Sequence, residues 1–362
     1  MRGSAENFLR PEWRIHMEFL MGADISSLQA MEDQGAEYFD LDGTKKDAIS
    51  ILKAHGVNCI RLRIFNRPER SFDRGDYCDL AGTLVMAKRI KEAGLKLLLN
   101  FHYSDFWADW KKQTMPADWN GQGKDEVAQS VYAFTGKVLK ELDAAGAYPD
   151  IVQIGNEIGC GLLWDYGTLE HPENIALFLN QGIRAVRDMQ RNGRKTEVMI
   201  HLECGGDAQR TGRFFAELQK HGVTDYDVIG LSYYPYWAGG YEKLQENMRN
   251  LARCYKKPVV VVETAFPYTD DSSDDMPNVV SSELTVETTG LKASVANQRR
   301  VTEEIIRLVK KEENGYGVFY WEPVWYCVKG AGVEKGSGNE WENQAMFDKN
   351  GRALDSLHAF EL

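Results

Sequence analysis

Residues 150–157 read Asp-Ile-Val-Gln-Ile-Gly-Asn-Glu, and residues 258–264 read Pro-Val-Val-Val-Val-Glu-Thr. Each stretch is a short, mostly apolar run that becomes polar at its last positions. Strands of a parallel sheet that are covered by helices on both faces have this composition. Each stretch therefore predicts a buried strand that delivers a glutamate to its carboxyl end.

The same pattern recurs about eight times along the chain, separated by longer amphipathic segments. Eight such units predict an α/β fold, a single-domain (β/α)8 TIM barrel whose site lies at the carboxyl ends of the strands. No GxGxxG motif follows the first strand, which disfavours a dinucleotide-binding sheet. The other strand candidates are residues 19–26, 57–65, 95–103, 197–204, 227–235 and 317–323. Helix candidates, several of which end at a glycine, include residues 44–56, 79–94, 124–146, 171–193 and 294–315.

The bulk composition suits one globular unit. The chain has 362 residues, of which 43% are hydrophobic, so it can bury a core without crosslinks. We expect a catalytic domain over residues 16–362, with residues 1–15 as an N-terminal extension or a remnant of cloning. The net charge of −11, without a long basic cluster, disfavours nucleic acid and membranes as partners. We expect a monomer with a neutral substrate.

The sequence gives two indications of the compartment. No stretch is long enough to span a bilayer, and the first residues lack the apolar run of a secretory signal. The chain as written is therefore expected in the cytoplasm, or outside the cell if a signal has been removed. The cysteines lack CxxC spacing and are expected to be buried free thiols, which tolerate a reducing compartment. They are Cys59, Cys78, Cys160, Cys204, Cys254 and Cys327.

Glu157 and Glu263 end the fourth and seventh strand candidates. These strands lie on opposite sides of an eight-stranded barrel, so both carboxylates face one cavity. Hydrolysis of a glycosidic bond needs such a pair, one acid to protonate the leaving oxygen and one carboxylate to attack carbon or activate water. We expect both to be catalytic, roughly 5 Å apart if configuration is retained and ~9 Å apart if it is inverted. The alternative is that each glutamate only pairs with an arginine.

Other side chains are expected to support this pair. Arg61 and Tyr233 are candidate hydrogen-bond donors to Glu263, which has to stay ionised. Arg63 shares the strand face of Arg61, and either arginine could instead be a structural ion-pair partner of Asp24. Asp24 itself either binds sugar hydroxyls or braces the rim of the barrel.

Aromatic residues are frequent at the expected rim. Sugar rings present C–H patches that pack on flat aromatic faces. Trp321 directly ends the eighth strand and is the best candidate for the floor of a sugar site, whereas a lone rim tryptophan more often only packs. The candidates are Trp107, Trp110, Trp164, Tyr234, Trp237, Trp321 and Trp325.

His102 and His201 close the third and fifth strands, where they either bind substrate or a glutamate or serve only the core. A metal centre that uses both histidines with Glu157 or Glu203 is disfavoured, because no HExxH or comparable spacing supports it. We therefore expect neither a metal site nor a cofactor.

Three rim loops are longer than most connections, which often indicates function. They follow the third, seventh and eighth strands and span residues 107–123, 267–290 and 326–347. The alternative is a disordered surface insertion, which suits the Asp/Ser-rich second loop best.

With these residues assembled, the sequence resembles glycoside hydrolase family 53, the arabinogalactan endo-β-1,4-galactanases, over nearly the whole chain. The most specific segments are FHYSDFWAD at residues 101–109 and YWEPVW at residues 320–325. The other matching segments are GADISS (22–27), RLR (61–63), GNE (155–157), SYYP (232–235) and VET (262–264).

The resemblance implies endo-acting, retaining hydrolysis of galactan on a TIM barrel, with Glu157 as acid/base and Glu263 as nucleophile. It also implies that residues beside the pair position the sugar. Together with the residue-by-residue reading, the expected substrate-binding set is Asp24, Arg61, His102, Asn156, His201, Tyr233, Trp237 and Trp321.

Three departures from the family limit this transfer. Asn100 stands where the family usually has an acid. The loop after the seventh strand lacks the aspartate-histidine-asparagine calcium pattern of many bacterial relatives, so bound calcium is not expected despite its four aspartates at 270, 271, 274 and 275. Compared with the family, the loop after the eighth strand looks short, which would change how many galactose units fit.

Two rival functions stay open. One is a glycosidase of the same clan that acts on another β-linked polymer, such as mannan or xylan. The other is a catalytically silent carbohydrate-binding barrel, which the presence of both Glu157 and Glu263 disfavours.

Overall fold

The computed structural model describes residues 17–68, 76–190, 193–332 and 338–362. Its parallel strands close into an eight-stranded barrel in chain order, with β1 paired to both β2 and β8. The predicted TIM barrel is confirmed, while the expected extension at residues 1–15 lies outside the described residues. The strands are β1 (Leu20–Asp24), β2 (Cys59–Ile64), β3 (Lys96–Phe101), β4 (Ile151–Ile154), β5 (Glu197–Leu202), β6 (Val228–Ser232), β7 (Val259–Thr264) and β8 (Gly315–Trp321).

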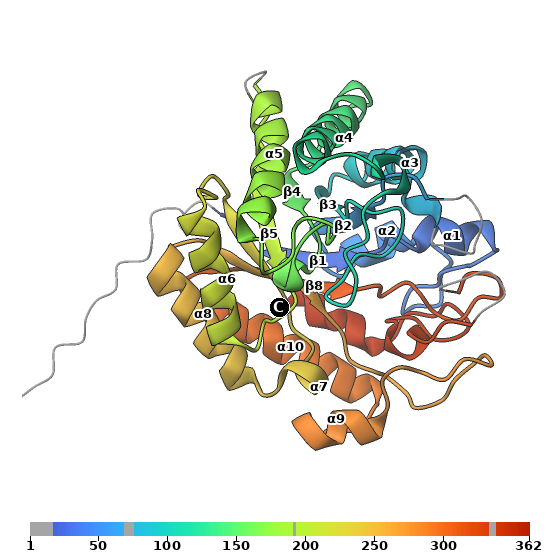
Figure 1. Ribbon diagram of the computed structural model, residues 1–362. Helices are drawn as coiled ribbons and strands as arrows, with labels where there is room; N and C mark the ends of the chain where they lie inside the picture. Colours follow the sequence, from blue (N-terminus) through green and yellow to red (C-terminus); the bar gives the residue numbers. More distant parts are fainter. Residues whose placement is uncertain (1–16, 69–75, 191–192, 333–337) are drawn as a thin grey trace, which may run out of the picture.

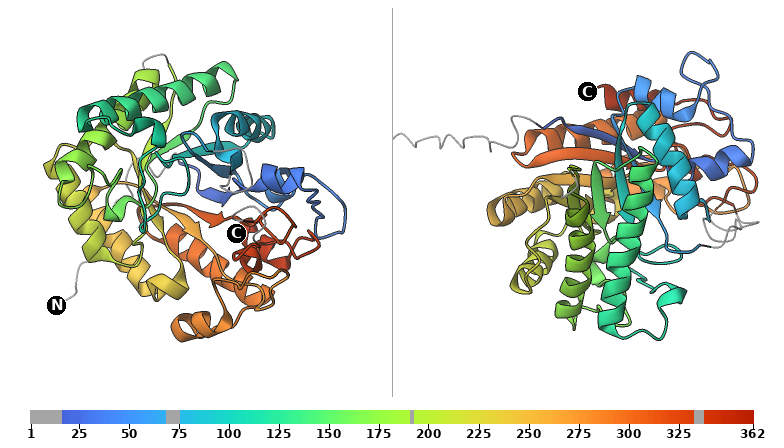
Figure 2. Two further views of the ribbon diagram at one scale, coloured as in Figure 1. Left: turned by 45° about the vertical axis from the view of Figure 1, so that its right-hand side comes forward. Right: turned by 90° about the horizontal axis from the view of Figure 1, so that it is seen from above.

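Helices surround the strands and follow one another around the barrel, so the red C-terminal part lies beside the blue α1 (Figures 1 and 2). The helix candidates are present with trimmed ends; residues 44–56, for example, give α2 over Ala48–Ala54, and residues 171–193 contain α5 over Pro172–Gln190. The α-helices are α1 (Leu28–Asp33), α2 (Ala48–Ala54), α3 (Leu80–Glu92), α4 (Lys124–Ala144), α5, α6 (Ala208–Lys220), α7 (Pro235–Ala238), α8 (Tyr241–Tyr255), α9 (Ser282–Thr289) and α10 (Val295–Lys311). Short 3₁₀ turns are η2 (Asp76–Cys78), η3 (Ala117–Trp119), η4 (Ile158–Cys160), η5 (Glu342–Gln344) and η6 (Asp355–Glu361).

Side chains along β2 point alternately into the barrel and toward the helices, so this strand contributes to both the core and the site. Cys59 belongs to the small apolar cluster inside the barrel, whereas Ile60 and Leu62 belong to the larger cluster between strands and helices. Because side chains alternate along a strand, Arg61 and Arg63 follow Cys59 into the barrel interior. Both arginines are buried near the carboxyl end of the strand.

The loops after β7 and β8 pack against each other, and we call them the paired loops. The amide of Tyr268 donates to the carbonyl of Asn343 at 2.8 Å, and that of Val279 donates to the carbonyl of Glu340 at 2.9 Å. The first loop contains α9 and the second contains η5. Where it is described, the Asp/Ser-rich loop is therefore a structured part of the rim rather than a loose insertion.

The cysteines are free, as predicted, but their burial varies. Cys160 and Cys327 are half-buried, and Cys254 on α8 is exposed, so the expectation that all six are buried is wrong. Cys254 lies outside the strands, on a helix whose polar face meets solvent. None of the helices in the described ranges combines the length and the apolar composition that a bilayer span requires.

Candidate active site

A cleft of about 1310 Å³ opens at the carboxyl ends of the barrel strands. Both expected catalytic glutamates line it. Six of the eight expected substrate-binding side chains also line it, and His201 and Tyr233 do not. The six are Asp24, Arg61, His102, Asn156, Trp237 and Trp321.

The two glutamates reach the cleft in different ways. Glu263 lies within β7, whereas Glu157 lies in a turn beyond β4, which ends at Ile154. Gly155 and Glu157 have φ values of 80° and 49° in this turn. A left-handed backbone is costly for a glutamate, and such conformations concentrate at functional sites.

The two carboxylates approach each other across the cleft. One oxygen of Glu157, one of Glu263 and one ring nitrogen of His201 all lie within 4.8 Å of one another. Pairs that act by direct displacement stand roughly 5 Å apart, and pairs with a water between nucleophile and sugar stand up to ~9 Å apart. The nearest oxygens of this pair are no farther apart than the shorter of these two separations.

Glu157 is almost fully buried and has one side-chain hydrogen-bond donor among the described residues. This donor is Ser232, whose hydroxyl donates to Oε1 at 2.7 Å. Burial, together with the negative charges of Glu263 and Glu203, raises the pKa of Glu157 well above its usual value. A carboxyl group in this setting keeps its proton where an ordinary glutamate is ionised.

Glu263 has stronger partners. Arg61 Nη1 donates to Oε1 at 2.7 Å, and the hydroxyl of Tyr234 donates to Oε2 at 3.2 Å. Burial raises the pKa of Glu263, but the guanidinium of Arg61 opposes that rise. Among the described residues no such cation lies against the Glu157 carboxylate, so burial raises its pKa with less opposition.

Arg61 organises the floor of the cleft. Besides Glu263, it donates to Asp24 Oδ2 at 3.0 Å, Asn156 Oδ1 at 2.9 Å and Gln153 Oε1 at 3.2 Å. Arg61 therefore fills both roles that the sequence left as alternatives, donor to Glu263 and ion-pair partner of Asp24. Since all of these groups are buried, they fix the position of the Glu263 carboxylate.

His201 reaches Glu157 through Ser232. Its Nε2 lies 2.9 Å from Ser232 Oγ, and its Nδ1 lies 3.0 Å from Gln153 Nε2. Burial lowers the pKa of His201 well below its usual value, so the ring is neutral. With the proton on Nε2, His201 accepts from Gln153 and donates to Ser232, which donates in turn to Glu157. Ser232 was not among the candidate site residues, although it directly precedes the Tyr-Tyr pair of SYYP.

Tyr233 does not make the expected contact. Its hydroxyl donates to the carbonyl of Gly239 at 2.7 Å, so its predicted donation to Glu263 is wrong. Tyr234, which had been considered only as a rim aromatic, makes that bond. Neighbouring residues of an extended chain point to opposite sides, so only one of the two tyrosines can face the barrel interior.

The model of Glycosyl hydrolase family 53 matches residues 20–360 of this chain. The chain belongs to this family. An arabinogalactan endo-beta-1,4-galactanase of Cellvibrio japonicus is 36% identical over 349 residues, which cover 94% of this chain and 89% of that protein. The GH53 catalytic domain of Ignisphaera aggregans has a TM-score of 0.90 and 39% identity, over 95% of this chain and 96% of that one. A structure of fungal beta-1,4-galactanases has a TM-score of 0.82 and 32% identity, over 94% and 98%. The protein is thus a glycoside hydrolase.

Aromatic rings form one wall of the cleft in this family 53 enzyme. The ring centroid of Trp321 lies 4.8 Å from that of Trp341 and 6.0 Å from that of Trp107. Trp237 on α7 is 52% exposed and offers an open face to a ligand. Trp341 was not among the candidates, because its loop gave no strand-end signal. Trp164, which was a candidate, lies outside the lining and donates to a main-chain carbonyl.

Asn100, a departure from the family 53 pattern, is part of the same network. Its amide donates to Asn156 Oδ1 at 2.9 Å. The neighbouring His102 accepts from the amide of Ala108 at 3.0 Å, and burial lowers its pKa well below the usual value. Asn100 and His102 therefore hold the loop after β3 and Asn156 in place beside the glutamates.

Three groups of described side chains have ligand atoms close enough to share a cation. One group contains both catalytic candidates, but Arg61 already binds one carboxylate and both ring nitrogens of the histidine have partners. This group therefore fits an acid pair better than a metal centre. A second group joins the paired loops, and the third lies at the other end of the barrel. The groups are Glu157, His201 and Glu263; Asp274, Cys327 and Glu342; and His55, His358 and Glu361.

Proposed function

We propose that this glycoside hydrolase cleaves β-1,4-galactosidic bonds inside galactan and retains the anomeric configuration, with Glu157 as acid/base and Glu263 as nucleophile. The observation that carries the proposal is a pair of buried carboxylates within 4.8 Å whose hydrogen-bond partners differ. The galactanases among its relatives support the choice of substrate.

The proposed reaction has two displacements. Glu263 attacks the anomeric carbon while the glycosidic C–O bond breaks, and the proton of Glu157 passes to the leaving oxygen. Glu157, now a carboxylate, then takes a proton from water, whose oxygen attacks the same carbon and releases Glu263. Two inversions at one carbon give net retention.

The surroundings suit a neutral sugar polymer. The aromatic wall supplies flat faces for sugar rings, and Arg61 and Ser232 hold the two carboxylates in place. The cleft of about 1310 Å³ is larger than a typical small-molecule pocket of roughly 300–1,000 Å³. An open cleft of this size accepts the middle of a chain rather than only its end.

Digestion of linear β-1,4-galactan tests the proposal. We expect a mixture of oligosaccharides early in the reaction, with the β-anomer released first, as measured by chromatography and proton NMR. Release of single sugars from the start would show attack on chain ends, and initial release of the α-anomer would show inversion. Faster cleavage of mannan or xylan would favour the rival glycosidase.

A further inference from the structure

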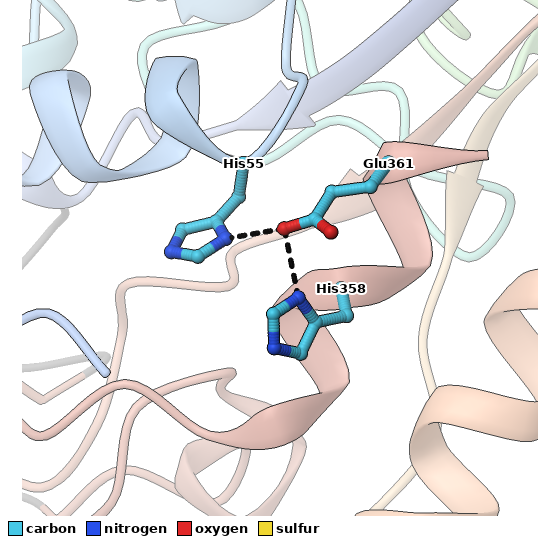
Figure 3. A group of neighbouring side chains, drawn as sticks. All are labelled: His55, His358 and Glu361. Atoms are coloured by element: carbon cyan, nitrogen blue, oxygen red, sulfur yellow. Dashed lines mark hydrogen bonds and ion pairs between the residues drawn. The ribbon is translucent and has the colours of Figure 1, made fainter. Parts of the chain in front are cut away.

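Three side chains at the amino end of the barrel, away from the cleft, converge on one point (Figure 3). His55 caps the C-terminus of α2, and His358 and Glu361 belong to η6. The Nδ1 atoms of His55 and His358 lie 2.8 Å and 2.7 Å from the same oxygen, Glu361 Oε1. His55 and Glu361 are 306 positions apart in the sequence, so no local sequence motif indicates this cluster.

The spacing of these atoms suits a small cation. One ligand atom of each residue lies within 4.8 Å of the other two. Zinc binds histidine nitrogen and carboxylate oxygen at ~2.0–2.1 Å, which places tetrahedral ligands roughly 3.3 Å apart. The two Nδ1–Oε1 distances, 2.8 Å and 2.7 Å, therefore have to lengthen by only about 0.5 Å. The side chain of Glu361 is 46% exposed near the end of η6, where such a shift is easy.

The cluster also has the outer partners that metal-binding histidines need. The Nε2 atom of His55 lies 2.8 Å from Asp40 Oδ1, and the side chain of Asp40 is 9% exposed. Lys46 and the amide of Leu41 hold that carboxylate. A carboxylate on the far nitrogen fixes the ring and directs its other nitrogen to the metal. Asp355 lies 3.8 Å from the Nε2 atom of His358 in a comparable place.

The charges at this point favour a cation. His55 stands between two carboxylates, with Nδ1 2.8 Å from Glu361 Oε1 and Nε2 2.8 Å from Asp40 Oδ1. Asp40, Glu361 and Asp355 face the histidines with negative charge, while Lys46 pairs with Asp40 and Arg299 pairs with Asp355.

We propose that His55, His358 and Glu361 bind a divalent first-row transition ion of the zinc class, with the remaining position left to water. The ion takes the Nδ1 lone pairs of both histidines and the Oε1 of Glu361, and the Nδ1 protons are released to solvent. The Nε2–H of His55 stays on Asp40.

Such an ion would fasten the end of the chain to the first part of the barrel. The backbone at Gly56 already lies close to that of η6: a Cβ on Gly56, whose φ is +101°, would lie 2.3 Å from the carbonyl oxygen of Phe360. η6 packs on α10, and His55 belongs to the α2–β2 turn. The role is structural, since the cluster lies at the end of the barrel opposite the cleft.

The test uses the full chain, freed of metal with a chelator and titrated with zinc chloride alone. We expect one ion per chain by calorimetry and a rise in melting temperature. His358→Ala should weaken binding by at least about a hundredfold, since even outer partners contribute roughly ten- to a hundredfold. Asp40→Asn should weaken it by roughly ten- to a hundredfold.

The matched control is His171→Ala, since His171 also pairs with a carboxylate, that of Glu173 at 3.2 Å, but this pair belongs to none of the described groups whose ligand atoms could share a cation. This variant should bind zinc as the parent does. Equal affinity of the parent and His358→Ala, no binding by the parent, or sulfur ligands in X-ray absorption would each overturn the proposal. Circular dichroism of the metal-free variants separates lost binding from lost folding.

Discussion

β4 and β7 each bring a glutamate to the cleft, but the backbone and the hydrogen-bond partners of the two glutamates differ. Glu157 sits in a left-handed turn beyond its strand, with a serine hydroxyl as partner. Glu263 sits within its strand, with Arg61 and Tyr234 on its two oxygens. Under the proposed mechanism, the environment, rather than the residue type, separates the carboxyl group that keeps a proton from the carboxylate that attacks carbon. Variants that alter one side only should therefore have different kinetic signatures.

The largest effect is expected on the β7 side. Glu263→Gln keeps the shape of the side chain but removes the negative charge of the proposed nucleophile. Turnover of galactan should fall on the order of 10⁵-fold, measured as the initial rate of reducing-sugar release. Glu141→Gln, an exposed site on α4, is the matched control and should keep the parent rate. A parent rate in Glu263→Gln would remove this residue from the mechanism.

The β4 side should respond differently to the leaving group. Glu157→Ala should slow galactan cleavage by roughly 10²- to 10⁴-fold. Aryl galactosides with activated leaving groups need less protonation and should retain a larger part of their rate. The ratio of the two losses is the measurement. Equal losses on both substrates would contradict the assignment of Glu157 as the acid.

A pair of adjacent variants tests which tyrosine serves Glu263. The hydroxyl of Tyr234 lowers the pKa of Glu263, which has to be ionised to attack. Tyr234→Phe should therefore raise that pKa and move the acid limb of the kcat/KM profile to higher pH. Tyr233→Phe should leave the limb in place and cost about 1 kcal/mol of unfolding free energy, measured in urea, because it loses only the bond to Gly239. Reversed results would return the role to Tyr233.

The smallest effect is expected at Ser232. Its hydroxyl bonds to Glu157 and lowers the pKa of that residue, which has to be protonated to act as the acid. Ser232→Ala should raise the pKa, so the alkaline limb of the kcat/KM profile moves to higher pH while the rate at its maximum changes less than about tenfold. Ser130→Ala on α4, where the hydroxyl bonds to Gln122, is the control and should move neither limb. A shift of the alkaline limb to lower pH would contradict the role of Ser232.

The fold could be predicted because buried parallel strands are short, almost entirely apolar runs that are easy to recognise in a sequence. Runs such as residues 258–264 give both the strand and the end at which its glutamate lies. The approach of Glu157 and Glu263 then follows from barrel geometry, since the fourth and seventh strands lie three places apart around the closed barrel and end at the same rim.

The details that failed depend on the backbone at strand ends. Tyr233 and Tyr234 are chemically equal, and the choice between them depends on alternation next to a register shift between Leu231 and Ser232. No sequence period locates such a shift. Trp341 was missed for a similar reason, because its place depends on contacts between loops that are distant in sequence.

Those contacts restrict how the rim can diversify. Trp341 faces Trp321 from the loop after β8, and this loop is held by main-chain bonds to the loop after β7 at Tyr268 and Val279. An insertion or deletion in either loop would thus displace the other and the indole that it carries. Grafting a single loop from a relative would break this joint support, so the two segments have to be exchanged as one cassette.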